Sequence, residues 1–359
     1  MDSYSLAFSL SNIGPKRFQL LLNHFETVEK AWDGSKEDYG QIGIVGKTWD
    51  TFEKFRTTCD IPHYIEALEK KNVTFISFFD KRYPNDLKKL ENPPIGLYCL
   101  GNISLLKNKS CIAIVGTRKI TEYGRSVTEQ IAGDLSGSGM CIVSGLALGV
   151  DGVSHRAALD SNGITIAVLA CGVDCCTPSE NYSLYKRILD GNGLIISEYP
   201  LSLPPNKGTF LMRNRIVAAL SDGILVTEAA EDSGSLVTAD WGFKLEKKVF
   251  AVPGPINSQM AQGSLKLLKQ GAHLVTNAED ILHEFSISNL QFSNKIKISK
   301  LKLSKEEKKI VSLLESDEMT IDEIAKKLKI DVSKLFISVS NLEIKGLVRN
   351  RNGKFALIT

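Results

Sequence analysis

The sequence lacks a strong excess of charge of either sign, because 44 Lys and Arg residues stand against 41 Asp and Glu residues and leave a formal net charge of +3. A polyanion therefore has no general electrostatic attraction to this chain, and any binding of one depends on cations that gather locally. The 359 residues are 43% hydrophobic and 24% charged, which is typical of soluble globular proteins. This length allows one large core with one or two smaller modules.

Long apolar runs and patterned cysteines are also missing. No stretch approaches the roughly 20 apolar residues of a membrane-spanning helix, and no basic leader precedes an apolar segment at the N-terminus. The seven cysteines lie mostly inside apolar runs, with no pair of CxxC knuckles and no nearby histidine pattern. We therefore expect reduced, buried thiols in a cytoplasmic protein, without a disulfide framework, a metal site or a membrane partner.

Three common ligand motifs are absent. A dinucleotide site needs G-x-G-x-x-G and a later acidic residue, but the first turn reads Val115-Gly116-Thr117-Arg118 and the next strand ends in Ser144-Gly145. The nearest match to a P-loop is Gly46-Lys47-Thr48, but Gln41 stands where the motif needs its first glycine, and no predicted strand leads into it. Neither glycine of a nucleophile elbow flanks Ser144. NAD binding, P-loop chemistry and serine hydrolysis are disfavoured, and we expect no cofactor.

Changes in the spacing of apolar residues divide the chain into blocks. Residues 1–71 have apolar side chains at helical spacing around the turn Asn12-Ile13-Gly14-Pro15, which predicts a small helical domain. A helix–hairpin–helix of this kind can present amides to a DNA phosphate, and a plain helical hairpin explains the pattern as well. Residues 286–303 are rich in Lys, Ser and Asn and predict a linker. Residues 304–359 predict a winged helix, with a third helix near 332–344 and a β wing turning at Asn352-Gly353.

The block of residues 72–285 alternates short apolar runs with segments of helical length. Continuous Val, Ile and Leu runs are typical of parallel strands that are buried on both faces, so the alternation predicts βαβ units. The fold class that follows is α/β, a Rossmann-like, doubly wound, mostly parallel sheet between the helical and winged-helix domains. Its strand candidates are 73–78, 97–100, 111–115, 140–143, 164–170, 194–196, 224–226 and 249–252.

The stretch 207–215 places three cations and an aromatic ring where a helix should begin. A helix N-terminus attracts phosphate, and a ring can stack on a base. Three further glycine-marked turns also connect a strand to a helix. Because ligands bind beyond the carboxyl ends of parallel strands, we expect one site that contains Gly116, Thr117, Arg118, Ser144, Gly145, Lys207, Phe210, Arg213, Asn214, Ser233, Gly234 and Ser235, with Arg215 a further candidate cation.

Carboxylates near these turns leave a second interpretation open. Asp151 and His155 lie four residues apart on one helix face. They could be ligands, an acid and base pair, or groups that fix the turn by hydrogen bonds. Glu228 follows the strand 224–226, but no second acidic residue at a matching strand end completes a hydrolytic site. A Rossmann-like hydrolase of nucleotides that uses Glu228, or Asp151 with His155, is the alternative to a binding protein.

Several anion-attracting turns in a row suit a strand of nucleic acid better than one nucleotide. Stacking on an aromatic ring contributes about 1–3 kcal/mol per base without regard to sequence. The salt slope is the slope of log K for binding against log salt concentration. Each phosphate of a single strand that a cation neutralises makes it more negative by about 0.7, so four cations predict a slope near −3. We therefore expect a single-stranded DNA-binding protein with no catalytic residue.

The motifs also resemble those of the bacterial DNA-processing protein A family (DprA, also called Smf) over nearly the whole length. The shared elements, in order, are Ile114-Val115-Gly116-Thr117-Arg118, Ser144-Gly145-Leu146-Ala147-Leu148-Gly149-Val150-Asp151, Phe210-Leu211-Met212-Arg213-Asn214-Arg215, Ser233-Gly234-Ser235-Leu236-Val237-Thr238-Ala239 and Phe250-Ala251-Val252-Pro253-Gly254. Each is short, but their order and spacing are specific.

The resemblance implies binding of single-stranded DNA without sequence preference, protection of incoming DNA during natural transformation, and loading of the recombinase RecA. It also implies a homodimer formed through the Rossmann-like domain and no established reaction. The third helix of the winged-helix block is poor in Lys and Arg, with Lys345, Arg349 and Arg351 near the wing as exceptions. Protein contact or regulation is therefore at least as plausible there as DNA contact.

Overall fold

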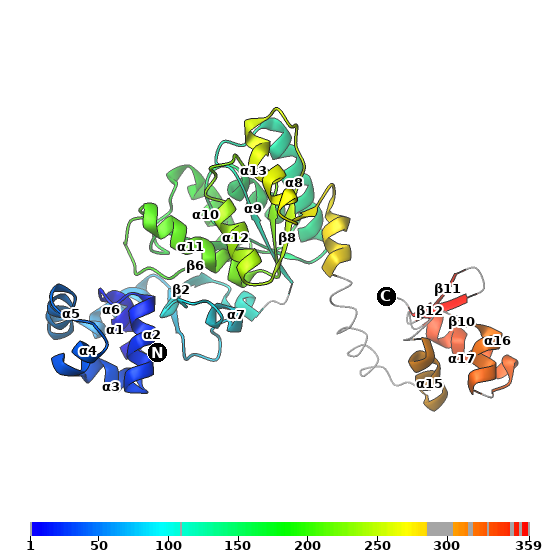
Figure 1. Ribbon diagram of the computed structural model, residues 1–359, viewed down its shortest axis with the longest axis horizontal. Coiled ribbons are helices and arrows are strands. Elements are labelled where there is room, and N and C mark those ends of the chain that lie inside the picture. The colour runs from blue at the N-terminus through cyan, green and yellow to red at the C-terminus, as the bar shows by residue number, and fades with distance from the viewer. Residues whose placement is uncertain are drawn as a thin grey trace. The chain divides into compact units, whose positions relative to one another are not determined.

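The computed structural model describes residues 2–107, 110–285, 304–314, 319–328, 330–344, 348–351 and 354–357. Contacts within the chain divide it into two compact units, Met1–Asp280 and Ile281–Thr359 (Figure 1). The predicted linker, 286–303, lies outside the described residues, as do Lys345 and the turn Asn352-Gly353. The domain boundaries drawn from the sequence stay predictions.

Six helices open the first unit and enclose an aromatic core. Phe8 packs against Phe18, Trp32 and Phe52, with ring centroids 5.1–5.6 Å apart. Tyr39 is buried beside Phe52 and donates its hydroxyl hydrogen bond to the backbone oxygen of Ala31, so its one polar atom is satisfied. The helices are α1 (Ser3–Leu10), α2 (Pro15–Phe25), α3 (Val28–Asp33), α4 (Lys36–Gln41), α5 (Lys47–Thr58) and α6 (Ile61–Lys70).

A nine-stranded sheet follows, in the order β1-β2-β6-β5-β4-β3-β7-β8-β9. The pairs from β6 to β9 are parallel, whereas β2 is antiparallel to both β1 and β6. The inner strands β3 to β7 are continuous apolar runs that are buried along their whole length, as predicted. The strands are β1 (Thr74–Ser77), β2 (Gly96–Gly101), β3 (Cys111–Val115), β4 (Cys141–Ser144), β5 (Thr165–Val168), β6 (Leu194–Ser197), β7 (Gly223–Val226), β8 (Lys248–Ala251) and β9 (His273–Leu274).

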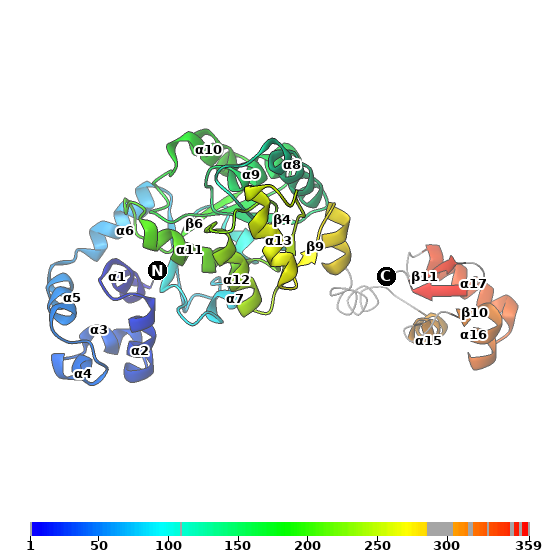
Figure 2. The same ribbon diagram turned by 45° about the horizontal axis from the view of Figure 1, so that its top comes forward.

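Helices cover both faces of this sheet. The chain advances from β3 to β6 through α8 (Glu122–Gly137), α9 (Val150–Asp160) and α10 (Tyr182–Asp190). It then returns to the far side of β3 through α11 (Lys207–Leu220), and α12 (Leu236–Lys244) and α13 (Gln262–Lys269) follow. Right-handed crossovers place the first three helices on one face and the last three on the other, as Figures 1 and 2 show. The carboxyl ends of β3, β4 and β7 therefore meet where the winding direction reverses.

The helical bundle and the sheet share part of their core. Leu6 and Leu68 from the bundle pack in one buried cluster with Phe75 of β1 and Tyr98 of β2. The Tyr98 hydroxyl also hydrogen-bonds the Ser9 hydroxyl, with the oxygens 2.7 Å apart. These contacts hold the bundle against the antiparallel edge of the sheet.

The second unit contains a small α/β module. Its described elements are α15 (Lys305–Leu314), β10 (Met319–Thr320), α16 (Ile321–Leu328), α17 (Val332–Ile344), β11 (Val348–Arg351) and β12 (Lys354–Leu357). The strands pair in the order β10-β12-β11, and the hairpin packs on the helices through Val348 and Phe355. This is the predicted winged helix, and with the doubly wound sheet it confirms the predicted fold class.

Two further expectations concern membranes and thiols. No helix in the described part of the chain is both long enough and apolar enough to span a bilayer. Cys99, Cys111, Cys141 and Cys171 are buried, as expected, and the other three cysteines are partly exposed. Burial raises the pKa of the Cys171 thiol to about 11, which keeps it protonated at neutral pH.

Candidate functional site

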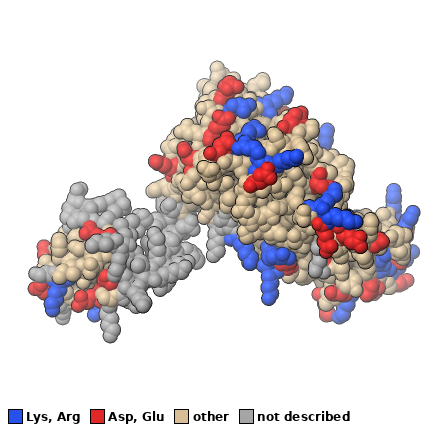
Figure 3. All heavy atoms as spheres, turned by 180° about the vertical axis from the view of Figure 1, so that it is seen from behind, with Lys and Arg blue, Asp and Glu red and all other residues tan. Residues whose placement is uncertain are grey.

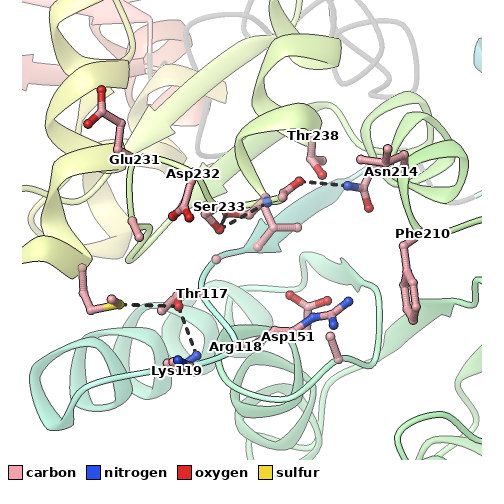
Figure 4. A pocket seen from close by; sticks show the side chains of 18 of the residues that line it. Thr117, Arg118, Lys119, Asp151, Phe210, Asn214, Glu231, Asp232, Ser233 and Thr238 are labelled. Carbon is pink, nitrogen blue, oxygen red and sulfur yellow. Dashed lines mark hydrogen bonds between the residues drawn. The ribbon is translucent and has the colours of Figure 1, made fainter. Parts of the chain in front are cut away.

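A cavity of about 760 Å³ opens at the carboxyl ends of β3, β4 and β7 (Figure 4). This is the topological switch point, where open α/β sheets bind ligands. Its wall combines the turn after β3, the start of α9, the first turns of α11, and the loop between β7 and α12. It is lined by Val115, Gly116, Thr117, Arg118, Lys119, Ala147, Asp151, Phe210, Leu211, Arg213, Asn214, Ala230, Glu231, Asp232, Ser233, Gly234, Ser235, Thr238, Gln259, Met260 and Gln262.

Arg118 and Phe210 form the cationic and aromatic part of this wall. The guanidinium carbon of Arg118 lies 4.7 Å from the centroid of the Phe210 ring, within the range of a cation–π interaction. Arg118 is exposed, so its charge is available to an anion. The turn that carries it is fixed by the Thr117 amide, which donates to the Glu228 backbone oxygen at 2.7 Å.

Close packing beneath this turn requires glycine at two positions. Gly149 has φ +75°, and a Cβ there would lie 2.1 Å from the Thr117 backbone oxygen. A Cβ on Gly116 would lie 2.5 Å from the Glu228 backbone oxygen. Both values are far shorter than a van der Waals contact, so these glycines bring the β3 turn and the start of α9 together.

Helix α11 begins at Lys207, where the sequence predicted a helix start. The Asn206 side chain accepts from the Thr209 amide, and the Thr209 hydroxyl accepts from the Asn206 amide, which forms a capping box. Phe210 then reaches the cavity one turn into the helix. Lys207 is exposed but does not line the cavity, and its predicted contact with DNA stays a prediction.

Arg213 lines the cavity but is largely buried, and its predicted contact with DNA stays a prediction. Its side chain is only 5% exposed, and Nη1 donates to the backbone oxygens of Gly145 and Val168 at 2.7 and 2.5 Å. Nε donates to the Asn214 side chain at 3.1 Å. Burial lowers the pKa of the guanidinium, and the nearby Asp151 carboxylate opposes that shift. Arg213 therefore holds the ends of β4 and β5 against α11, and it also forms part of the cavity floor.

Two other predicted contact residues lie beneath the surface for the same reason. Ser144 is fully buried, and its hydroxyl donates to the Ile114 backbone oxygen at 2.7 Å. Gly145 is buried under Arg213, and a Cβ at this position would lie 2.1 Å from the Arg213 Nη1 atom. The Arg213 guanidinium covers this turn, so neither residue lines the cavity, and their predicted part in the site stays a prediction.

The turn Ser233-Gly234-Ser235 does line the cavity, together with Asn214. The Asn214 side-chain amide donates to the Gly234 backbone oxygen at 3.0 Å. The two serine hydroxyls hydrogen-bond each other, with oxygens 2.8 Å apart. Asn214 thus couples α11 to the turn that begins α12, and a ligand in the cavity would meet a preformed wall.

Arg215, the further candidate cation, faces the interior. It is 1% exposed and lies 2.5 Å from the Glu198 carboxylate, which is also buried. Burial raises the pKa of Glu198, and the Arg215 charge opposes that shift. Side chains two positions apart on a helix point in different directions, so Arg213 and Arg215 reach different strand ends. The charge of Arg215 is neutralised by Glu198.

Acidic side chains share the cavity wall, which the sequence interpretation missed. Glu231 and Asp232 precede the serine turn and lie on the side of the cavity away from Phe210 (Figure 4). Asp151 lines the floor, where burial raises its pKa and the Arg213 charge opposes the shift. The wall is therefore mixed in charge, with the Arg118 side cationic. The dipeptide Glu231-Asp232, directly before the turn, was the available signal.

The residues named for hydrolysis have structural partners. Both carboxylate oxygens of Glu228 accept from Thr121, one from its amide at 2.9 Å and one from its hydroxyl at 2.6 Å. They fix the start of α8. His155 is fully buried, and its Nδ1 lies 2.6 Å from the Thr165 hydroxyl oxygen. Burial lowers the pKa of His155 to about 3, so the ring is neutral.

Asp151 does not pair with His155 either. Its carboxylate accepts from the Gly145 amide at 3.1 Å and fixes the β4–α9 turn. Of the three roles that the sequence left open for Asp151, the structure supports the one in which its carboxylate fixes the turn by a hydrogen bond. The pair therefore offers no acid and base at one point in the cavity.

A family of known proteins matches the part of this chain that contains the sheet and the cavity. A family model described as DNA recombination-mediator protein A matches residues 74–286, which span the sheet and the cavity. This chain belongs to that family. A second model, described as sugar-specific transcriptional regulator TrmB, matches residues 298–358, in the part of the chain that contains the winged helix.

Individual relatives agree with the family assignment. Protein Smf of Synechocystis is 36% identical over 286 residues, which cover 78% of this chain and 72% of the relative. DNA processing protein DprA of Bacillus subtilis is 38% identical over 233 residues, which cover 65% of this chain and 78% of the relative.

Solved structures of two family members have the same fold. DNA processing protein A of Streptococcus pneumoniae matches with a TM-score of 0.70 and 33% identity, over 79% of this chain and 98% of that one. The protein of Helicobacter pylori, solved for its single-stranded DNA binding mode, matches with a TM-score of 0.55 and 34% identity. That match covers 60% of this chain and 96% of the other.

Proposed function

We propose that this protein binds single-stranded DNA in the cavity at the switch point of its sheet. The observation that carries the proposal is the exposed Arg118 guanidinium stacked 4.7 Å from the centre of the Phe210 ring. A cation beside an aromatic face serves a phosphate and a base of the same strand, and neither contact depends on base sequence. The Helicobacter pylori relative, solved for its single-stranded DNA binding mode, supports this ligand.

The family supports the rest of the proposal. The protein protects single-stranded DNA that enters during natural transformation or arises in homologous recombination, and it loads the recombinase RecA onto that DNA. It acts in the cytoplasm as a homodimer formed through the Rossmann-like domain and catalyses no reaction. The contacts of Glu228 and His155 support a binding protein over the nucleotide hydrolase, since both residues have structural partners.

Replacing Phe210 with alanine tests the site. The ring lines the cavity, and loss of one stacked base is worth about 1–3 kcal/mol, or about 5- to 150-fold in affinity. We expect this loss in fluorescence-anisotropy titrations with oligothymidylate. The salt slope should stay unchanged, because no phosphate contact is removed.

The matched control is Phe243→Ala on α12, which removes a similarly half-exposed ring away from the cavity. Its affinity for oligothymidylate should equal that of the unaltered protein. Equal affinity of the Phe210 and Phe243 variants would refute the proposed site. Turnover of mononucleotides that Glu228→Gln abolishes would favour the hydrolase.

Replacing Asp232 with asparagine is expected to tighten DNA binding. The carboxylate lines the cavity and repels phosphate, and one such repulsion at about 4 Å in water is worth about 1 kcal/mol, or about fivefold. The gain should shrink as salt screens the repulsion. Asp240→Asn, an exposed change on α12 outside the cavity, should have no such effect. Unchanged or weaker binding by the Asp232 variant would contradict this account of the acidic rim.

A further inference from the structure

A group of cations lies on the face of the sheet covered by α8, α9 and α10. It comprises Arg125 of α8, Arg156 of α9, and Lys186 and Arg187 of α10. Figure 3 shows Lys and Arg side chains over the middle of this unit, with Asp and Glu side chains among them, when it is seen from behind. None of the four residues lines the cavity. We refer to them as the α9 patch.

Arg156 has no ion pair within the described residues, whereas Arg125 and Arg187 each lie close to a carboxylate. Arg187 lies 2.6 Å from Asp160, and Arg125 lies 4.0 Å from Glu129. No ion pair or hydrogen bond of Arg156 occurs within the described residues. Its side chain is half-buried. Burial, followed by repulsion from Arg125, lowers its pKa, and the Glu129 and Asp160 carboxylates oppose that shift. A cation held in this way is stabilised by an anion from outside the chain.

The guanidinium of Arg156 also lies next to the cavity rim. A Cβ built on Gly152 would lie 3.4 Å from the Arg156 Nη2 atom, 3.3 Å from the Asn181 side-chain nitrogen and 3.2 Å from the Ala147 backbone oxygen. The three groups therefore surround one point at the start of α9. Ala147 lines the cavity, and Asn181 donates to its backbone oxygen at 3.0 Å. Arg156 is therefore close to a residue of the cavity wall.

An exposed aromatic ring lies farther along the same path. Tyr182, at the start of α10, is 51% exposed, and the Lys186 Nζ atom lies 4.9 Å from its ring centroid. Its ring stacks on Tyr185, which is held in place because its hydroxyl donates to the Val173 backbone oxygen at 2.7 Å. The combination of a fixed ring and an adjacent cation repeats that of Phe210 and Arg118.

We propose that the α9 patch is a second segment of the single-stranded DNA path, which receives the strand as it leaves the cavity on the α9 side. Arg156 binds a phosphate, and Tyr182 stacks on a base. This inference rests on the proposed function, because the cavity holds the first segment. It assigns the strand a direction over α9 and α10, away from the acidic rim at Glu231 and Asp232.

Oligonucleotide length separates the two segments. A short oligothymidylate of about 6 nucleotides fits the cavity alone, whereas one of about 20 nucleotides reaches the patch. We expect Arg156→Gln to weaken the long oligonucleotide about fivefold to tenfold, and to lower its salt slope by about 0.7 for the lost phosphate. Tyr182→Ala should weaken the long oligonucleotide to a similar degree without changing the slope. Neither variant should affect the short one.

The short oligonucleotide also reports whether the variants fold, and Arg17→Gln, an exposed arginine on α2, is the matched control. Unchanged affinity of the Arg156 variant for the long oligonucleotide would overturn the second segment and leave the cavity site intact. Equal weakening of both lengths would also overturn it, since Arg156 would then act through the cavity. If the unaltered protein binds neither oligonucleotide, the proposed function itself fails.

Discussion

Replacing Arg215 with methionine is expected to lower the free energy of unfolding by about 3–5 kcal/mol, because it leaves the Glu198 carboxylate buried without its counter-charge. The Arg215 Nε and Nη1 atoms and the Glu198 Oε1 atom have no hydrogen-bond partner within the described residues. The pair is therefore held mainly by one close contact, and the loss is dominated by the charge left behind. Urea unfolding followed by circular dichroism measures this change.

A second substitution tests that explanation. Adding Glu198→Leu to Arg215→Met removes the stranded carboxylate, and apolar replacement of a buried ion pair is often neutral or stabilising. The double variant should thus recover most of the stability lost by the single variant. If the double variant is no more stable than Arg215→Met alone, then packing, and not the uncompensated charge, accounts for the loss.

Arg118 and Arg213 are expected to respond differently to the same change to glutamine. Arg118→Gln removes an exposed charge-assisted phosphate contact, worth about 1.5–3 kcal/mol, or about 10- to 150-fold in affinity for oligothymidylate. It should also reduce the salt slope by about 0.7. The melting temperature should stay near that of the unaltered protein, because the side chain is not part of the core.

Arg213→Gln should lose both binding and stability. The buried guanidinium satisfies the backbone oxygens of Gly145 and Val168, and its charge balances Asp151. A lost partner costs about 1–3 kcal/mol for each buried group left unsatisfied. Calorimetry and anisotropy on the two variants separate the roles. Full stability with lost binding in the Arg213 variant would restore it as a direct contact residue.

The fold was accessible from the sequence because its strands are continuous apolar runs between glycine-marked turns. Strand β3 begins and ends at the predicted residues, and α17 also matches its predicted range. The boundaries of other strands shift by a residue or more, since hydrogen-bond pairing and not hydropathy sets where a strand ends. The position of the ligand site at the carboxyl ends of the strands followed from the alternating order of strands and helices.

The site was only partly accessible, because the direction of a side chain on a packed helix depends on its neighbours. In sequence, the cations of 207–215 look like one exposed group. In the structure, carbonyl groups at the ends of β4 and β5 accept from Arg213, and Glu198 after β6 pairs with Arg215. No local pattern encodes these long-range partners. Arg118 and Phe210, which depend mainly on turn and helix starts, do line the cavity, and their contact with DNA stays a prediction.

The shared core of the helical bundle and the sheet has a mechanical consequence. Since Leu6 and Leu68 bury their side chains against Phe75 and Tyr98, cutting the chain after α6 would expose apolar surface on both pieces. Bundle and sheet should therefore melt in one cooperative transition. A force applied to the first unit would then be resisted by its helices and its strands together.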